Sequence, residues 1–190
     1  MELMMIFLFI PLSELIDCRV WQYPPKYLTL SEENTMNINN INHLNQNFID
    51  SCANGATTHL LGLAAGSQKL YVNIDYIPPK SFSAKYHSHS QQEEFFLILD
   101  GCGTLRINDE EHHIKKGDFI AKPPGQNIAH TFYNSGIETL SVLDVGTKEK
   151  EDTCYYPDED IYLHKSNGVS KVFKGTSLLS DWTSEPDAGD

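Results

Sequence analysis

The sequence predicts an all-β fold, built as a barrel or sandwich. From about residue 58 onwards, short β-type runs alternate with turn signals at intervals of roughly ten residues, which is typical of such folds. No helical pattern of useful length interrupts these runs. The 190 residues suffice for one domain with tails and a buried core, but not for two complete barrels.

The first predicted strand is the run 70–77, in which Leu70, Val72, Ile74 and Tyr76 share one face. Two prolines follow it and end the strand. Residues 108–110 form a polar turn between two runs and predict a hairpin. The further runs predicted as strands are 82–89, 94–99, 104–108, 111–114, 119–122, 130–134 and 139–145.

The two ends of the chain differ in composition from the predicted barrel. Met36 opens a more ordinary sequence than the apolar start, so either Met1 or Met36 is a possible first residue. We predict five segments: an N-terminal extension that need not belong to the folded domain, an Asn-rich lead-in, the barrel, a C-terminal segment packed on it, and an acidic disordered tail. Their ranges are 1–35, 36–57, 58–147, 148–179 and 180–190.

The apolar run 4–12 bears on location. It is too short for a membrane span, which needs about 20 residues. It is also a poor signal peptide, because Glu2 precedes it and no basic residue appears before Arg19. The four cysteines form no CxxC pair, and we interpret them as free intracellular thiols. We therefore predict a cytoplasmic protein without a membrane span, with export through the apolar run as the alternative.

The charge of the chain excludes some partners. The formal net charge is −12, and Arg19 and Arg106 are the only arginines. A phosphate backbone would find no basic surface on which to release its counterions, so we expect no nucleic-acid binding. The same shortage argues against 2-oxoglutarate-type oxygenases, whose cosubstrate usually meets an arginine, because the barrel contains only Arg106.

Three histidines and one glutamate are the candidate metal ligands. His87 and His89 stand at i and i+2, which on a strand places both imidazoles on one face. Glu94 follows after four residues, where the next strand begins, and His130 opens a later strand. Three imidazoles and one carboxylate suit a single divalent ion of iron, manganese, nickel, cobalt or zinc, whereas calcium prefers oxygen ligands alone.

The spacing of these residues resembles the two sequence motifs of the cupin superfamily. In the first motif, HxH is followed by Glu94 and, after six intervening residues, by Gly101, with Ser81 where the motif begins with glycine. The second motif is represented by Gly117, Pro123, Gly125, His130 and Asn134, with the histidine two residues later than in the common pattern. The resemblance implies a double-stranded β-helix (jelly-roll) barrel, a bound metal and a homodimer. It points to bacterial single-domain cupins of mostly unassigned reaction.

Other residues near the motifs have weaker claims to the site. We interpret His112 and His113 as an exposed polar hairpin, with His112 as a reserve ligand. Lys85 is a possible cation for an anionic substrate. Candidate pocket-lining side chains, for which core packing or exposure is the alternative, are Tyr86, Phe96, Arg106 and Phe132.

Three functions are compatible with this pattern. The first is a metalloenzyme, an oxygenase, isomerase or decarboxylase acting on a small oxygen-rich organic acid or sugar derivative, as the resemblance implies. The second is a non-catalytic module that binds a small molecule. The third is a structural dimer in which the metal only ties strands together. No catalytic residue is assigned from the sequence.

Overall fold

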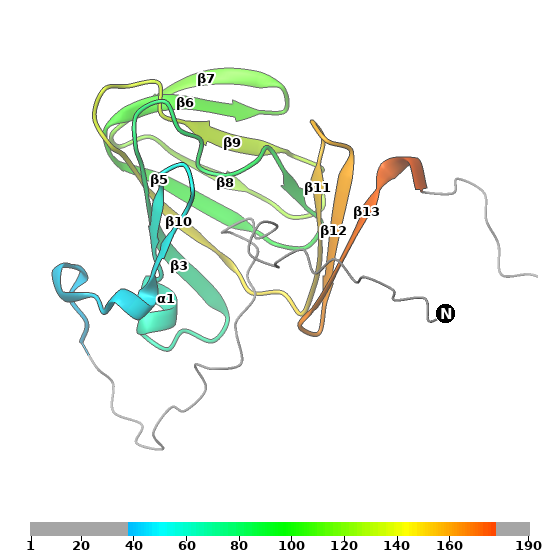
Figure 1. Ribbon diagram of the computed structural model, residues 1–190, viewed down its shortest axis with the longest axis horizontal. Helices are drawn as coiled ribbons and strands as arrows, with labels where there is room; N and C mark the ends of the chain where they lie inside the picture. The colour runs from blue at the N-terminus through cyan, green and yellow to red at the C-terminus, as the bar shows by residue number, and fades with distance from the viewer. Residues whose placement is uncertain (1–37, 178–190) are drawn as a thin grey trace, which may run out of the picture.

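The computed structural model describes residues 38–177, and these form an almost entirely β structure (Figure 1). The predictions for residues 1–35 and 180–190 lie outside the described residues. Short helices are the only helical elements described: η3 (Ile41–His43), η4 (Gln46–Phe48), α1 (Leu61–Ala64) and η5 (Gly175–Ser177). Within residues 38–177, none of the helices has the length and apolar character needed to cross a membrane.

The strands form three antiparallel sheets. The six-stranded sheet has the order β1 (Ile49–Ser51), β2 (Thr57–His59), β3 (Leu70–Ile77), β10 (Leu140–Thr147), β5 (Glu94–Asp100) and β8 (Phe119–Lys122). The three-stranded sheet has the order β7 (Glu110–Lys115), β6 (Cys102–Ile107) and β9 (His130–Tyr133). The four-stranded sheet has the order β13 (Val169–Lys174), β12 (Ile161–Ser166), β11 (Glu151–Tyr156) and β4 (Ser88–His89).

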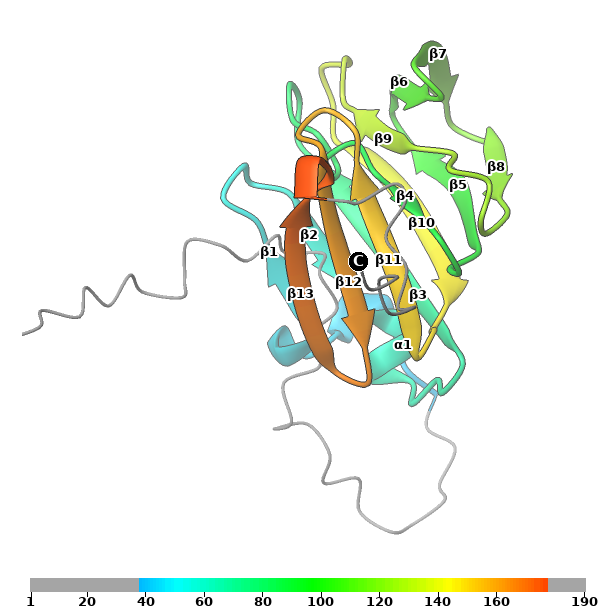
Figure 2. The ribbon, with the colours of Figure 1, turned by 90° about the vertical axis from the view of Figure 1, so that its right-hand side faces the viewer.

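The main core is made by side chains from the six-stranded and three-stranded sheets. Strand β3 has the predicted bounds, and the face that carries Tyr71, Asn73, Asp75 and Ile77 is the buried one. The core residues that pack together are Ile77, Phe96, Ile98, Leu105, Ile114, Phe132, Leu140 and Val142. The four-stranded sheet has a smaller cluster of its own, made by Cys154, Tyr156 and Leu163. In Figure 2, β11, β12 and β13 lie as a separate layer beside the larger sheet.

The predicted hairpin turn is present between β6 and β7. Asn108 and Asp109 both have positive φ angles, of 49° and 63°. Two consecutive residues in this region are typical of the hairpin turn whose twist matches that of the strands, and asparagine and aspartate tolerate it better than most residues. His112 and His113 are exposed on β7, as predicted.

One strand prediction was wrong, and the C-terminal segment has more regular structure than the sequence indicated. Only Ser88 and His89 of the run 82–89 form a regular strand. Phe82 and His87 pair with β9 only through single, isolated bridges, so the predicted strand is not continuous. Residues 148–179, predicted as a segment that packs on the barrel, contain the strands β11, β12 and β13. Their high charge at the start suggested the end of the barrel, yet β11 pairs with β4 and brings Cys154 opposite His89.

The prediction of four free thiols is also wrong for Cys52, and Cys18 lies outside the described residues. Cys102 and Cys154 are free, but Cys52 is disulfide-bonded. The absence of a CxxC pair does not exclude such a bond, since disulfide formation depends on Cα distance in space rather than on sequence spacing. Because Cys52 is disulfide-bonded, the cysteines no longer support the predicted intracellular location of the protein.

Candidate metal centre

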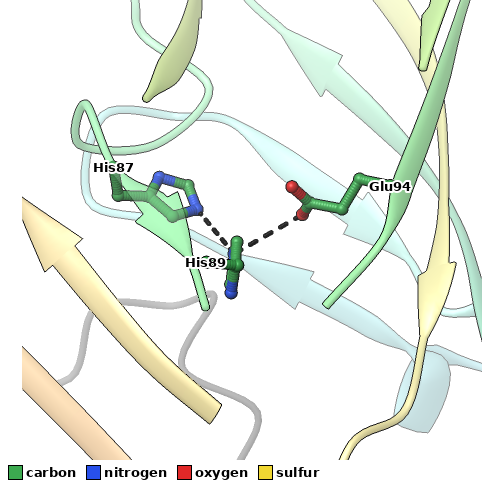
Figure 3. Close-up of side chains that lie close together, drawn as sticks. All are labelled: His87, His89 and Glu94. Carbon is green, nitrogen blue, oxygen red and sulfur yellow. Dashed lines mark hydrogen bonds and ion pairs between the residues drawn. The ribbon is translucent and has the colours of Figure 1, made fainter. Parts of the chain in front are cut away.

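The side chains of the two histidines of the HxH segment and of Glu94 lie close together (Figure 3). His87 precedes β4, His89 ends it, and Glu94 is the first residue of β5. The Nε2 atoms of His87 and His89 are 3.1 Å apart, and Glu94 Oε1 lies 3.5 Å from His89 Nε2. Each residue offers one ligand atom, and these three atoms lie within 4.8 Å of one another.

His130 approaches this group from β9, but it is not among the three residues whose ligand atoms lie within 4.8 Å of one another. Two backbone hydrogen bonds join His130 and His87. The N–H group of His130 donates to the carbonyl oxygen of His87 at an N···O distance of 2.9 Å, and that of His87 donates to the carbonyl oxygen of His130 at 3.2 Å. The two residues therefore lie directly opposite each other on paired segments. The ring centroids are 5.0 Å apart, and His130 Nε2 lies 3.9 Å from Glu94 Oε2. The longer loop before His130 therefore still delivers its ring to the edge of the cluster.

Hydrogen bonds on the far side of the two rings fix their tautomers. His87 Nδ1 lies 2.7 Å from the carbonyl oxygen of Lys85, and His89 Nδ1 lies 2.6 Å from Asp152 Oδ2. Because these oxygens only accept, both Nδ1 atoms carry hydrogen and donate. A neutral ring then presents a lone pair on Nε2. Two such lone pairs facing each other at 3.1 Å require a cation between them, either a proton or a metal ion.

Asp152 is a site residue that the sequence analysis missed. Its Oδ1 atom accepts hydrogen bonds from the backbone N–H groups of Ser90 and Gln91, at 3.0 and 2.9 Å. Its Oδ2 atom accepts from His89. A carboxylate that holds the second nitrogen of a histidine sets the orientation of the ring and is a usual companion of metal-ligating histidines.

Glu94 is held by two buried side chains that were also missed. Lys122, opposite Glu94 on β8, places Nζ 2.6 Å from Oε2, and both side chains are almost fully buried. The Tyr71 hydroxyl group lies 2.9 Å from Glu94 Oε1 and 2.9 Å from Asp144 Oδ1. These contacts fix the carboxylate and leave a lone pair of Oε1 toward the histidines, since a carboxylate oxygen accepts more than one bond.

The pKa values of the cluster follow from burial and charge. Burial lowers the pKa of His87, and the charges of His89 and His130 lower it further, so the ring stays neutral. For His89, burial acts to lower the pKa, but the charge of Glu94 and the bond to Asp152 raise it to about 9. Burial would raise the pKa of Glu94, but His130, His89 and Lys122 together hold it well below its usual range.

The predicted pocket residues separate into two groups. Phe96 and Phe132 belong to the core, where the Phe96 ring lies 4.9 Å from the ring of His130. Tyr86 and Arg106 line a cleft of about 470 Å³ beside the candidate metal centre. We call this the rim cleft, and define it by Lys85, Tyr86, Arg106, Tyr156, Asp158 and Glu159. The centroids of the Tyr156 and His87 rings are 5.6 Å apart and the rings are stacked, so Tyr156 both lines the cleft and contacts the cluster.

Comparison with known families agrees with this architecture. Residues 74–146 match the cupin domain family, and this segment contains all four predicted ligands. Residues 74–146 form a cupin domain. The cupin barrel accounts for the way in which two short motifs, far apart in the chain, bring their histidines to one end of the interior.

Several known proteins are similar to this cupin. An uncharacterised protein of Methanocaldococcus jannaschii is 34% identical over 93 residues, which are 49% of this chain and 63% of that protein. The chain therefore spans less than two thirds of that relative. A putative sugar phosphate isomerase from Acidithiobacillus ferrooxidans has a TM-score of 0.65 at 28% identity, covering 68% of this chain and 83% of the other. A sugar phosphate isomerase of the cupin superfamily from Silicibacter pomeroyi has a TM-score of 0.62, also at 28% identity, with coverages of 66% and 81%.

Proposed function

We propose that this cupin is a metal-dependent isomerase that acts on a small sugar derivative. The observation that carries the proposal is the facing pair of Nε2 atoms of His87 and His89, 3.1 Å apart beside Glu94 Oε1. This arrangement suits a divalent ion, with His130 as the fourth ligand. Two solved structures similar at 28% identity, one described as a putative sugar phosphate isomerase and the other as a sugar phosphate isomerase, favour isomerisation over the oxygenase and decarboxylase alternatives.

The residues of the site would have different roles in the reaction. The four ligands would hold the ion, which as a Lewis acid would polarise a carbonyl oxygen of the substrate. Asp152 would keep His89 oriented, and Lys122 would keep Glu94 in place. Burial and the neighbouring carboxylates raise the pKa of Tyr71 well above its usual value, so its hydroxyl group stays protonated.

Asp144 is our candidate for the group that moves the proton. Isomerisation between an aldose and a ketose shifts hydrogen between two adjacent carbons, which requires a base that takes a proton from one carbon, exchanges it with solvent and protonates the other carbon. Asp144 is only partly buried, and the Tyr71 hydroxyl group links it to Glu94. It is therefore close to the ligands without being one of them.

The first experiment tests metal and reaction together. Untagged protein is expected to contain about one equivalent of transition metal. In deuterium oxide, proton NMR should show loss of carbon-bound hydrogen from a sugar phosphate during turnover. Asp144→Asn should retain the metal and lose turnover by at least about a hundredfold, the usual size of acid–base catalysis.

Different results would favour the other functions. Metal without turnover on any ligand that raises the melting temperature would indicate a binding module. Absence of metal from the purified protein and from protein incubated with iron, manganese, cobalt, nickel or zinc would reject the metal centre. The homodimer implied by the resemblance stays a prediction, because a single chain does not test it.

The metal affinity is expected to rise with pH. In the metal-free site the pKa of His89 is raised to about 9, so below this pH a metal ion must displace a proton from His89. His87 is neutral and Glu94 is ionised across the same range, so about one proton is released per ion. The apparent affinity for Co²⁺ should rise about tenfold per pH unit between pH 6.5 and 9 and then level off. Isothermal titration in buffers of different ionisation enthalpy measures both quantities, and a flat profile would contradict the assignment.

A further inference from the structure

The rim cleft carries two cations that are both held by one turn. Lys85 Nζ lies 2.6 Å from Glu159 Oε1. Arg106 makes a two-pronged contact with Asp158, with Nη1 to Oδ2 at 2.7 Å and Nη2 to Oδ1 at 3.0 Å. Asp158 and Glu159 are neighbours in the turn between β11 and β12, so two parallel ion pairs hold this turn against the cleft.

The geometry around Arg106 suits a phosphate group. A planar guanidinium group binds carboxylate and phosphate oxygens in the same two-pronged way, and a lysine adds a point charge. Arg106 also has a support that does not depend on the turn, because its Cζ atom lies 3.7 Å above the Tyr86 ring. The guanidinium group would therefore keep its place at the cleft if Asp158 moved away.

We propose that the rim cleft binds the phosphate group of the substrate, and that Asp158 and Glu159 occupy the two cations until phosphate displaces them. The proposal rests on the function proposed above and names its substrate class, a phosphorylated sugar. The turn then acts as a latch that the ligand opens.

The charges of the cleft make this exchange necessary. With the turn in place, Lys85 and Arg106 face three carboxylates, since Asp109 also contacts Arg106 Nη2 at 2.7 Å. The local charge is then unfavourable for an anion. When Asp158 and Glu159 leave, two cations face Asp109 alone, and the balance becomes favourable.

Opening of the latch is expected to require little free energy. The paired side chains are considerably exposed: 57% for Lys85 and 44% for Glu159, with Arg106 at 32% and Asp158 at 54%. Exposed ion pairs contribute little to stability, because water screens them and ordering long side chains costs entropy. A doubly charged phosphate can therefore compete with the two carboxylates.

The cleft is close enough to serve the metal centre. Tyr156 forms part of its wall and stacks on His87. Lys85 also belongs to both regions, because its carbonyl oxygen accepts the hydrogen bond from His87 Nδ1 while its ammonium group lies at the cleft. A sugar whose phosphate group lies in the cleft would extend toward the ligands past Tyr156.

The test measures the binding of inorganic phosphate to metal-free protein by calorimetry, at pH 8 and at constant ionic strength. The variant Asp158→Asn/Glu159→Gln should bind phosphate about tenfold more tightly than the wild type, because the competing carboxylates are gone. The variant Lys85→Gln/Arg106→Gln should show no measurable binding. Lys116→Gln removes another exposed ion pair, that with Asp100, and should leave phosphate affinity unchanged.

Two results would overturn the proposal. One is equal phosphate affinity in the wild type and in Asp158→Asn/Glu159→Gln. The other is a loss in Lys116→Gln as large as that in Lys85→Gln/Arg106→Gln, which would indicate non-specific attraction. Circular dichroism checks that each variant is folded. If Lys85→Gln/Arg106→Gln is unfolded, Arg106→Lys replaces it; this change keeps the charge, loses the two-pronged contact and should weaken phosphate binding.

The experiment is independent of the reaction. Because the protein is metal-free, phosphate binding can succeed even if no metal or isomerisation is found, and isomerisation can succeed without it. With metal added, a sugar phosphate should bind while the free sugar does not. Binding of both with equal affinity would place the phosphate group outside the cleft and contradict the substrate class.

Discussion

His89→Ala is expected to abolish stoichiometric metal binding. This side chain contributes Nε2 to the cluster, and both His87 Nε2 and Glu94 Oε1 lie within 3.5 Å of that atom. Losing a hydrogen-bond partner outside the ligands typically costs about 10- to 100-fold in metal affinity, and the loss of a ligand should cost more. Metal analysis after equilibration with Co²⁺, together with direct titration, measures the change.

Two further variants serve as comparisons for His89→Ala: one changes a hydrogen-bond partner of His89, and the other changes a histidine outside the site. Asp152→Asn keeps the shape of the side chain but weakens the bond to His89 Nδ1, so the affinity should fall by about 10- to 100-fold. His112→Ala removes an exposed histidine on β7 and should have no effect. If His89→Ala and His112→Ala bind metal equally well, the proposed centre is wrong. Asp152→Asn also covers the possibility that His89→Ala does not fold.

The proximity of the candidate ligands is the feature of the site that the sequence predicts best. The i, i+2 spacing of His87 and His89 predicts a shared face, and their Nε2 atoms are indeed in contact distance. His130 was less certain from its long preceding loop. What brings its ring to the edge of the cluster is the backbone bridge to His87, a long-range pairing that spacing alone does not specify.

The residues that support the ligands were not predictable in the same way. Period-two alternation shows which face a side chain occupies, but not which strand lies opposite. Lys122 resembles a surface lysine at the end of a short strand, and only the register between β5 and β8 places it against Glu94. Asp152 belongs to a charged run, and only the pairing of β11 with β4 brings it to His89.

The rim cleft also could not be predicted from the sequence, because it depends on the pairing of distant strands. Lys85 and Arg106 were considered as cations for an anionic substrate, but they are 21 residues apart in the sequence and gave no sign of a common site. The hairpin of β11 and β12, which the sequence analysis did not predict, supplies the carboxylates that contact both of them. The fold class therefore follows from local patterns, whereas the second layer of the site depends on tertiary pairing.

Lys122→Met is expected to destabilise the metal-free protein by about 3–5 kcal/mol, the usual cost of removing one partner of a buried ion pair. Lys122 is 2% exposed and Glu94 4%, so the remaining carboxylate would have no water to replace the ammonium group. Chemical denaturation of metal-free protein measures the free energy of unfolding.

A matched variant and a double variant separate the buried pair from a general effect of losing a lysine. Lys116→Met breaks an exposed pair with Asp100 at 3.2 Å and should cost less than about 1 kcal/mol. Lys122→Met/Glu94→Gln removes both charges, and because no uncompensated carboxylate is left, it should recover part of the stability lost in Lys122→Met. Equal losses in Lys122→Met and Lys116→Met would show that Lys122 does not stabilise Glu94. In that case the carboxylate is balanced by the histidines alone, and the role of Lys122 in holding a metal ligand would have to be abandoned.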